Sequence, residues 1–76
     1  MTTAKIKLST IEDIRNFVNI MMTNDVEADL HLGRYTVDAS SLMGIFSLDL
    51  LKPLELLIHR GDSADILKKI DQYIVK

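Results

Sequence analysis

The chain has no cysteine, no tryptophan, one proline and only three glycines in 76 residues. Without cysteine it has neither a disulfide framework nor a thiolate zinc site. Its nine Lys and Arg residues are interspersed among eleven Asp and Glu residues, so it lacks the basic stripe that nucleic-acid binding needs. No apolar run approaches the roughly 18 residues of a membrane span, and residues 1–5 lack the apolar core of a signal peptide. We therefore expect a cytoplasmic protein with no metal, no cofactor and no nucleic-acid or membrane partner.

The composition is that of one small folded domain. Hydrophobic residues make up 47% of the chain and charged residues 26%. A chain of this length buries about 60% of its unfolded surface, which is enough for one core. No linker, internal repeat or low-complexity segment divides it, so we predict a single domain over residues 1–76.

Four segments alternate apolar and polar residues, which is typical of strands buried on one face. The predicted strands are 4–8, 26–32, 35–37 and 54–58, and the Gly33-Arg34 turn joins the middle two in a hairpin. Helical spacing of apolar residues predicts helices over 11–22, where Ile11 begins the apolar face, over 41–48, and from Ser63 to Ile74. Two capping boxes are possible at the start of the first helix, one formed by Ser9 with Glu12 and the other by Thr10 with Asp13.

The predicted order of elements is βαββαβα. Such an order in a short chain indicates an α+β fold, in which helices cover one face of an antiparallel sheet and the other face is open to water. His31 and His59, the only histidines, fall at polar positions of two strands. We expect both on the open face, toward opposite ends and too far apart to share a metal ion.

The segment from Ser41 to Leu48 is apolar on both sides of a short helix. Residues three and four apart share a helix face, so Leu42, Met43 and Phe46 fall on one side, and Ile45 and Leu48 on the other. One small domain cannot bury both sides. We expect Ile45 and Leu48 in the core and the other three in an exposed apolar patch, which is typical of a contact site. The alternative is that a loop of the chain, near Leu50 or Leu51, covers the patch.

The same segment, Ser-Leu-Met-Gly-Ile-Phe-Ser-Leu, resembles the serine-bearing segment of HPr, the phosphocarrier of the bacterial sugar phosphotransferase system. In many Gram-positive members that segment reads Ser-Ile-Met-Gly-Val-Met-Ser-Leu. The resemblance implies an open-faced β-sandwich with sheet order 1-4-2-3 and three helices on one face. It also implies that Leu42, Met43 and Phe46 contact enzyme I, HPr kinase or a transcriptional regulator.

The resemblance fails at the family's active site. Aligned without a gap, the phosphorylated histidine of HPr falls at Thr10, and the arginine two residues later falls at Glu12. Threonine has no imidazole to accept phosphate, and Glu12 reverses the charge that would stabilise a phosphoryl group. The plain alternative for Thr10 is the N-cap of its own helix.

Ser41 matches the serine that a dedicated kinase phosphorylates in Gram-positive HPr proteins, so the resemblance implies a regulatory site there. The alternative is again a helix N-cap, a role that Ser40 could also fill. We interpret the chain as an HPr-like protein that lacks the phosphoacceptor histidine, is not an enzyme, and acts as a protein-binding or regulatory module. The alternatives are a phosphocarrier with an atypical acceptor, or a structural domain that dimerises through the patch and has no signalling role.

Overall fold

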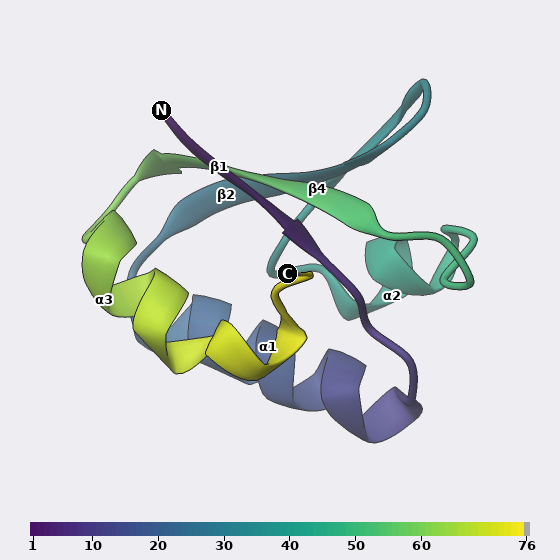
Figure 1. Cartoon of the computed structure of the whole chain (residues 1–76), viewed down its shortest axis with the longest axis horizontal. Coiled ribbons are helices and arrows are strands. Elements are labelled where there is room, and N and C mark those ends of the chain that lie inside the picture. The colour runs from purple at the N-terminus through teal and green to yellow at the C-terminus, as the bar shows by residue number, and fades with distance from the viewer. Residues whose placement is uncertain (76) are drawn as a thin grey trace.

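A computed structural model describes residues 1–75 and has the predicted order of elements (Figure 1). The strands are β1 (Thr2–Ile6), β2 (Glu27–Leu32), β3 (Tyr35–Asp38) and β4 (Leu54–Arg60). The helices are α1 (Ile11–Thr23), α2 (Leu42–Phe46), α3 (Ser63–Lys69) and a 3-10 turn, η1 (Asp71–Tyr73). The strands form one antiparallel sheet in the order β1-β4-β2-β3. The predicted α+β class and strand order are therefore confirmed.

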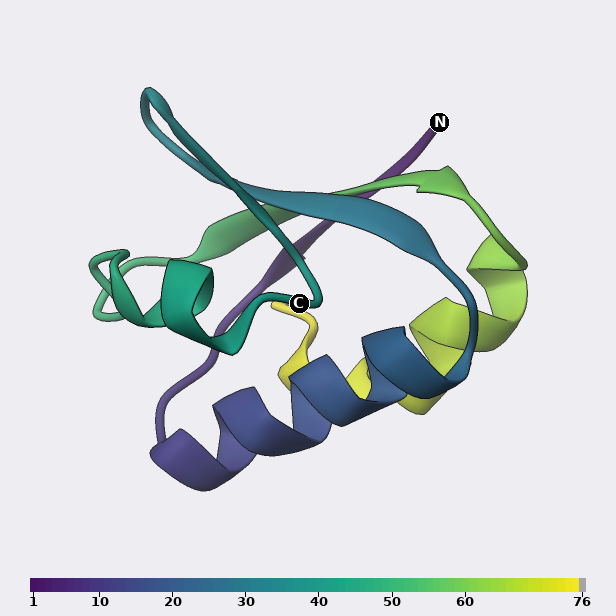
Figure 2. The same ribbon diagram turned by 180° about the vertical axis from the view of Figure 1, so that it is seen from behind.

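The core lies between one face of this sheet and the helices. Figures 1 and 2 show all three α-helices on the same side of the sheet, with the other side uncovered. Inward side chains alternate along the strands, as a period of two requires, and are at most 2% exposed in the case of Ile6, Leu30, Leu54, Leu56 and Ile58. From α1, Ile14, Phe17, Val18 and Met21 pack against them.

Helix α1 begins with the Thr10–Asp13 capping box, which resolves the two predicted alternatives. The Thr10 Oγ1 accepts a hydrogen bond from the Asp13 N–H at 3.0 Å, and the Asp13 carboxylate accepts one from the Thr10 N–H at 3.3 Å. Ile11 was expected on the buried face, but it is 63% exposed. The buried stripe starts one turn later, at Ile14, because the capping turn lies outside the core.

The end of the chain also differs from the prediction. A continuous helix to Ile74 was expected, but α3 ends at Lys69 and Ile74 forms an antiparallel bridge with Ile6. The Lys7 N–H donates to the Tyr73 carbonyl at 2.8 Å, and the Val75 N–H donates to the Lys5 carbonyl at 2.8 Å. These backbone groups pair with the edge of the sheet and are not free for helical bonds. The Tyr73 ring is 5% exposed and lies edge-on to Phe17, with ring centroids 6.4 Å apart.

The first strand is also displaced, since it covers Thr2–Ile6 where residues 4–8 were expected. Leu8 is still fully buried, so the predicted inward phase is right. The strand ends earlier because its partner β4 begins at Leu54, which lies opposite Ile6.

The capping box gives a stability prediction. Thr10→Ala removes the acceptor for the Asp13 N–H and should lower the free energy of unfolding by about 1 kcal/mol. Ser9→Ala is the matched control and should change it by less than about 0.5 kcal/mol, because Ser9 takes part in this turn through its backbone. Urea denaturation at neutral pH measures both, and an equal loss in the two variants would contradict the assignment of the cap.

Candidate functional site

Helix α2 is placed by a tight turn after β3. The Asp38 carboxylate accepts hydrogen bonds from the Ser40 N–H at 2.8 Å and from the Ser40 hydroxyl at 2.6 Å. The Ser41 N–H donates to the Asp38 carbonyl at 3.0 Å. The hydroxyl of Ser40, followed by its backbone N–H, lowers the pKa of Asp38, because both bonds favour the ionised carboxylate. The chain therefore leaves the sheet in a fixed direction.

Ser41 is the N-cap of α2. Its Oγ accepts a hydrogen bond from the Gly44 N–H at 3.1 Å, whereas the Ser40 hydroxyl is bonded to Asp38. Gly44 allows close packing at this point, since a Cβ there would lie 3.1 Å from the Ser41 Oγ and 3.2 Å from the Val37 Cβ. Of the two serines considered for the cap, Ser41 fills the role.

The two sides of α2 face different environments. Ile45 is fully buried and Leu48 is 8% exposed, so this side belongs to the core. Met43 is 78% exposed and Phe46 is 41% exposed. The burial expected for Ile45, Leu48 and Met43 is therefore confirmed, and Phe46 is exposed as expected but over less than half of its surface. Large apolar side chains are thus left facing solvent on a helix that is already anchored in the core.

Leu42 does not follow the prediction. It was expected with Met43 and Phe46 in solvent, but it is half-buried and packs against the core. The reason is geometric: Leu42 lies four residues before Phe46 but three before Ile45, so it sits on the border of the two faces. The exposed part of the patch on α2 is therefore Met43 and Phe46.

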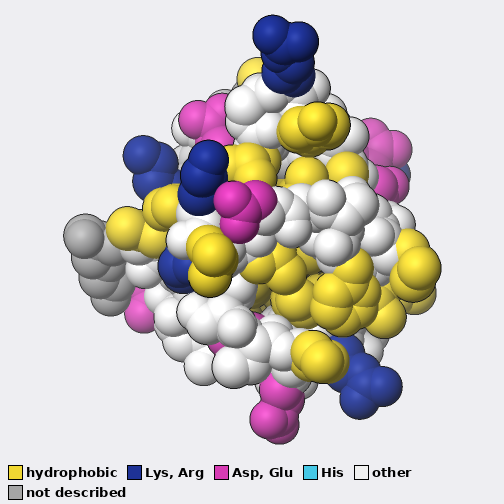
Figure 3. All heavy atoms as spheres, turned by 90° about the vertical axis from the view of Figure 1, so that its right-hand side faces the viewer, with side chains coloured by type: hydrophobic (Ala, Val, Ile, Leu, Met, Phe, Trp, Pro, Cys, Tyr) yellow, Lys and Arg dark blue, Asp and Glu magenta, His cyan; other side chains and the backbone are white. Residues whose placement is uncertain are grey.

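A further exposed apolar residue, Leu51, comes from the loop between α2 and β4 and is 86% exposed. The Lys7 ammonium holds this loop by donating to the carbonyls of Leu50 at 2.9 Å and Leu51 at 2.8 Å. Leu50 is half-buried against the core, and Leu51 points away from it, so the loop does not bury Met43. Figure 3 looks onto this end of the molecule and shows hydrophobic side chains gathered over it.

The sequence offered a weak signal for the exposure of Leu51. Leu50 and Leu51 are adjacent in a short loop, and adjacent residues tend to point in different directions, so one of the two was a candidate for exposure. Alternation alone could not say which one, because the loop follows neither a helical nor a strand period. Met43 and Phe46 are called the α2 patch below.

Thr10 lies at the exposed N-terminus of α1, where it forms hydrogen bonds within the first turn. Its hydroxyl accepts from the Asp13 N–H, and the Asp13 carboxylate accepts from the N–H groups of Ser9 and Thr10 at 3.2 and 3.3 Å. Glu12, in the same turn, is exposed. The Asp13 N–H at this end of the helix is therefore occupied, and Glu12 and Asp13 place two carboxylates in the first turn, an arrangement unfavourable to a bound phosphoryl group.

The histidines lie on the uncovered face of the sheet. The His59 Nε2 is 2.8 Å from the Asp29 Oδ2. His31 stands beside Glu55 in the β2–β4 register, four residues along β4 from His59. Among residues 1–75 no group of three His, Cys, Asp or Glu side chains is placed to hold a metal ion. Within the same residues no helix is long and apolar enough to cross a membrane.

Two solved structures resemble the whole chain. HPr-C-His from Thermoanaerobacter tengcongensis has a TM-score of 0.79 at 19% identity, with 95% of this chain and 89% of that chain covered. A phosphocarrier protein HPr from Bacillus anthracis str. Ames has a TM-score of 0.73 at 18% identity, with 97% and 96% covered. No profile of a known family matches the chain, and no curated protein matches it in sequence. The chain therefore has the fold of HPr phosphocarriers.

The two faces of α2 predict opposite effects of the same substitution. Ile45→Asp should unfold the domain, because it places a charge in the core. Met43→Asp should change the free energy of unfolding by less than about 0.5 kcal/mol, as exposed substitutions usually do. Phe46→Asp should cost more than Met43→Asp, because more than half of Phe46 is covered, but should leave the protein folded.

Circular dichroism and urea denaturation distinguish these outcomes. A folded Ile45→Asp protein, or an unfolded Met43→Asp protein, would contradict the orientation of α2.

Proposed function

We propose that this chain is an HPr-like protein-binding module that uses the α2 patch and does not carry phosphate. The observation behind the proposal is the division of α2 into a buried side, Ile45 and Leu48, and an exposed side, Met43 and Phe46. The apolar residues on the buried side, Ile45 and Leu48, are explained by their contribution to the stability of the core. Those on the exposed side, a methionine and a phenylalanine, add nothing to the core, and such exposed apolar residues are typical of a contact site.

The partner would be a protein with an apolar groove. Methionine and phenylalanine are large, and methionine adapts its shape to the surface it meets. The resemblance of Ser41–Leu48 to HPr suggests enzyme I, HPr kinase or a transcriptional regulator as the kind of partner. A second copy of this chain is the rival occupant, and Met43→Asp would then dissociate a dimer in sedimentation measurements.

The proposal excludes the phosphocarrier role because of the chemistry at Thr10. A reversible carrier at neutral pH needs a nucleophile whose pKa lies near 7, which an imidazole supplies and an aliphatic hydroxyl does not. The Thr10 hydroxyl is also occupied by the Asp13 N–H, and Glu12 and Asp13 repel an anionic donor. The family's chemistry would thus be lost while its fold is kept.

Ser41 is the candidate for regulation at the same surface. It precedes Leu42 and Met43 directly, so a phosphate on its hydroxyl would add negative charge beside the α2 patch. The Gly44 N–H, which now donates to the Ser41 Oγ, would then donate to a phosphate oxygen, a stronger acceptor. A partner that binds the α2 patch would then distinguish the phosphorylated from the unphosphorylated protein.

Incubation with enzyme I and phosphoenolpyruvate tests the loss of carrier activity. No phosphorylated form should be detected by intact-mass measurement, because neither Thr10 nor Glu12 offers the required chemistry. A histidine-containing HPr in the same reaction is the positive control. An acid-labile adduct of about 80 Da, the mass of one phosphoryl group, on this chain would reject the proposal.

An HPr-type kinase tests the regulatory part. If such a kinase labels this chain, peptide mapping should place the phosphate on Ser41, because Ser41 alone combines the N-cap of α2 with the adjacent Leu42 and Met43. Ser41→Ala should abolish labelling, and Ser40→Ala, the matched control one residue earlier, should leave it intact. Phosphate on another serine would refute the assignment.

A further inference from the structure

A cavity of about 550 Å³ lies between the tip of the β2–β3 hairpin and the turn that follows α2. The side chains that line this hairpin cavity include Leu32, Arg34, Tyr35, Leu48, Asp49 and Lys52. Figures 1 and 2 show the turn of the hairpin projecting from the molecule at the end where α2 lies. Binding sites for small molecules have volumes of about 300 to 1,000 Å³, so the hairpin cavity has the size of such a site.

The apolar wall of the cavity arises because the hairpin is longer than the core beneath it. Leu32 and Tyr35 stand opposite each other at the end of the β2–β3 ladder. They are in phase with Leu30 and Val37, because residues two apart in a strand share a face. Leu30 is fully buried, whereas Leu32 is half-buried and Tyr35 is 68% exposed. The inner face of the hairpin is therefore covered at Leu30 and open at Tyr35.

Two cations line the cavity and have no ion-pair partner. Within residues 1–75 no carboxylate lies within ion-pair distance of Arg34 or Lys52, and both side chains are exposed. Asp49 lines the same cavity, but its Oδ1 accepts the Leu51 N–H at 3.1 Å, so a backbone donor satisfies part of this carboxylate. The lining thus carries two cations against one carboxylate, and the cavity favours a negatively charged occupant.

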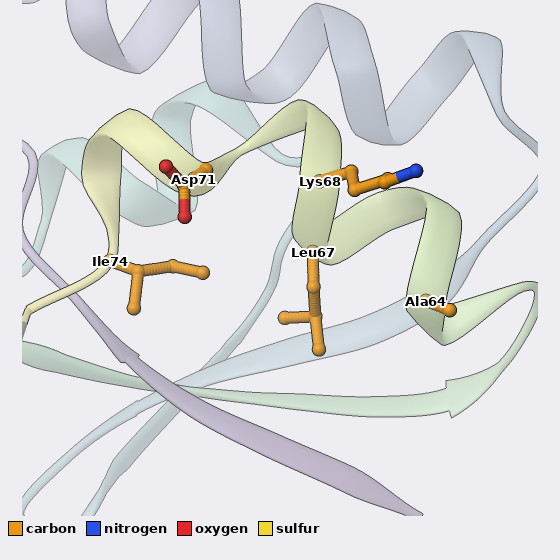
Figure 4. Close-up of a pocket in the computed structure, with 5 residues that line it drawn as sticks. All are labelled: Ala64, Leu67, Lys68, Asp71 and Ile74. Carbon is orange, nitrogen blue, oxygen red and sulfur yellow. The ribbon is translucent and has the colours of Figure 1, made fainter.

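A second cavity, of about 460 Å³ between α3 and the sheet, lacks this excess of positive charge. Figure 4 shows Leu67 and Ile74 pointing toward the sheet, while the Lys68 side chain extends in another direction. The described residues of its lining carry one cation, Lys68, and one carboxylate, Asp71. Since the two cavities are similar in size, this second cavity is a reference for the effect of charge in the first.

We propose that the hairpin cavity binds a small aromatic anion, whose phosphate or carboxylate group pairs with Arg34 and Lys52 and whose ring packs against Tyr35. Arginine and lysine bind both kinds of anionic group through charge-assisted hydrogen bonds. Aromatic rings attract each other in stacked and edge-to-face arrangements, beyond the effect of the area that they bury. Leu32 and Leu48 extend the apolar surface under the ring. An inorganic ion would leave this apolar part of the cavity unfilled.

The hairpin cavity is distinct from the α2 patch. Met43 and Phe46 do not line it, so the ligand site does not depend on the proposed function. The two surfaces also differ in chemistry, because the patch presents apolar side chains alone and the cavity combines an apolar wall with unpaired cations. Few polar groups on a mostly apolar wall are typical of a site that orients a small molecule.

The test uses phenyl phosphate as the probe, added to the ¹⁵N-labelled full chain at neutral pH and low salt, at up to about 10 mM, where millimolar affinities are detected. Backbone chemical shifts should change at Gly33, Tyr35 and Lys52 with one common dissociation constant, and stay unchanged at Leu67. Benzyl alcohol, a ring without charge, and inorganic phosphate, a charge without a ring, should each bind at least about tenfold more weakly. Benzoate in place of phenyl phosphate distinguishes the two anionic groups, and the tighter ligand identifies the one that the site prefers.

Substitutions at exposed positions separate the two parts of the site without unfolding the chain. Arg34→Gln and Lys52→Gln remove one charge each and should each weaken phenyl phosphate binding by about fivefold, as expected for exposed ion pairs. Tyr35→Ala should weaken it through loss of the ring. Lys68→Gln, at the second cavity, is the matched control and should leave binding unchanged. Absence of shifts at the highest probe concentration overturns the proposal, and so does binding that Arg34→Gln and Lys52→Gln both leave intact or that inorganic phosphate equals.

Discussion

The structure depends on the burial of one face of a single four-stranded sheet. Because side chains alternate along a strand, a shift of one residue in the pairing would move Leu30 and Leu56 from the core into water. The register is therefore fixed by burial, and all helices must lie on the same side. The uncovered side carries solvated pairs, Asp29 with His59 and Glu27 with Arg60, that contribute little to stability.

The same constraint produces the α2 patch. Helix α2 and the turn after it cover the end of the core near β3, where Ile45 and Leu48 are buried. A helix this short has almost no stability of its own, so its position depends on the Ser41 cap and on packing. The close approach that Gly44 permits to Val37 fixes the helix against β3. The outward side chains then stand on a rigid base, which suits a contact surface.

Periodicity predicted the strands and the buried side of α2, because both depend on which residues face the core, whereas the order of the strands in the sheet was implied by the resemblance to HPr. It failed where another interaction decided. Ile11 fits the apolar stripe of α1, but the capping turn lies outside the core. Ile74 fits the stripe of α3, but its backbone pairs with β1. The exposure of Leu51 leaves no trace in hydrophobic spacing, because its loop follows neither a helical nor a strand period.

The turn at Thr10 bears on the proposed loss of the carrier role. The free N–H groups at the start of a helix are available either to an anion or to a cap, but not to both. Here the Asp13 N–H bonds to Thr10, and the Asp13 carboxylate bonds to the N–H groups of Ser9 and Thr10. These bonds stabilise α1, they occupy the Asp13 N–H, and they hold the Asp13 carboxylate in the first turn beside Glu12. A phosphoryl group at this end would lose that donor and meet two negative charges, so helix capping and phosphate binding oppose each other here.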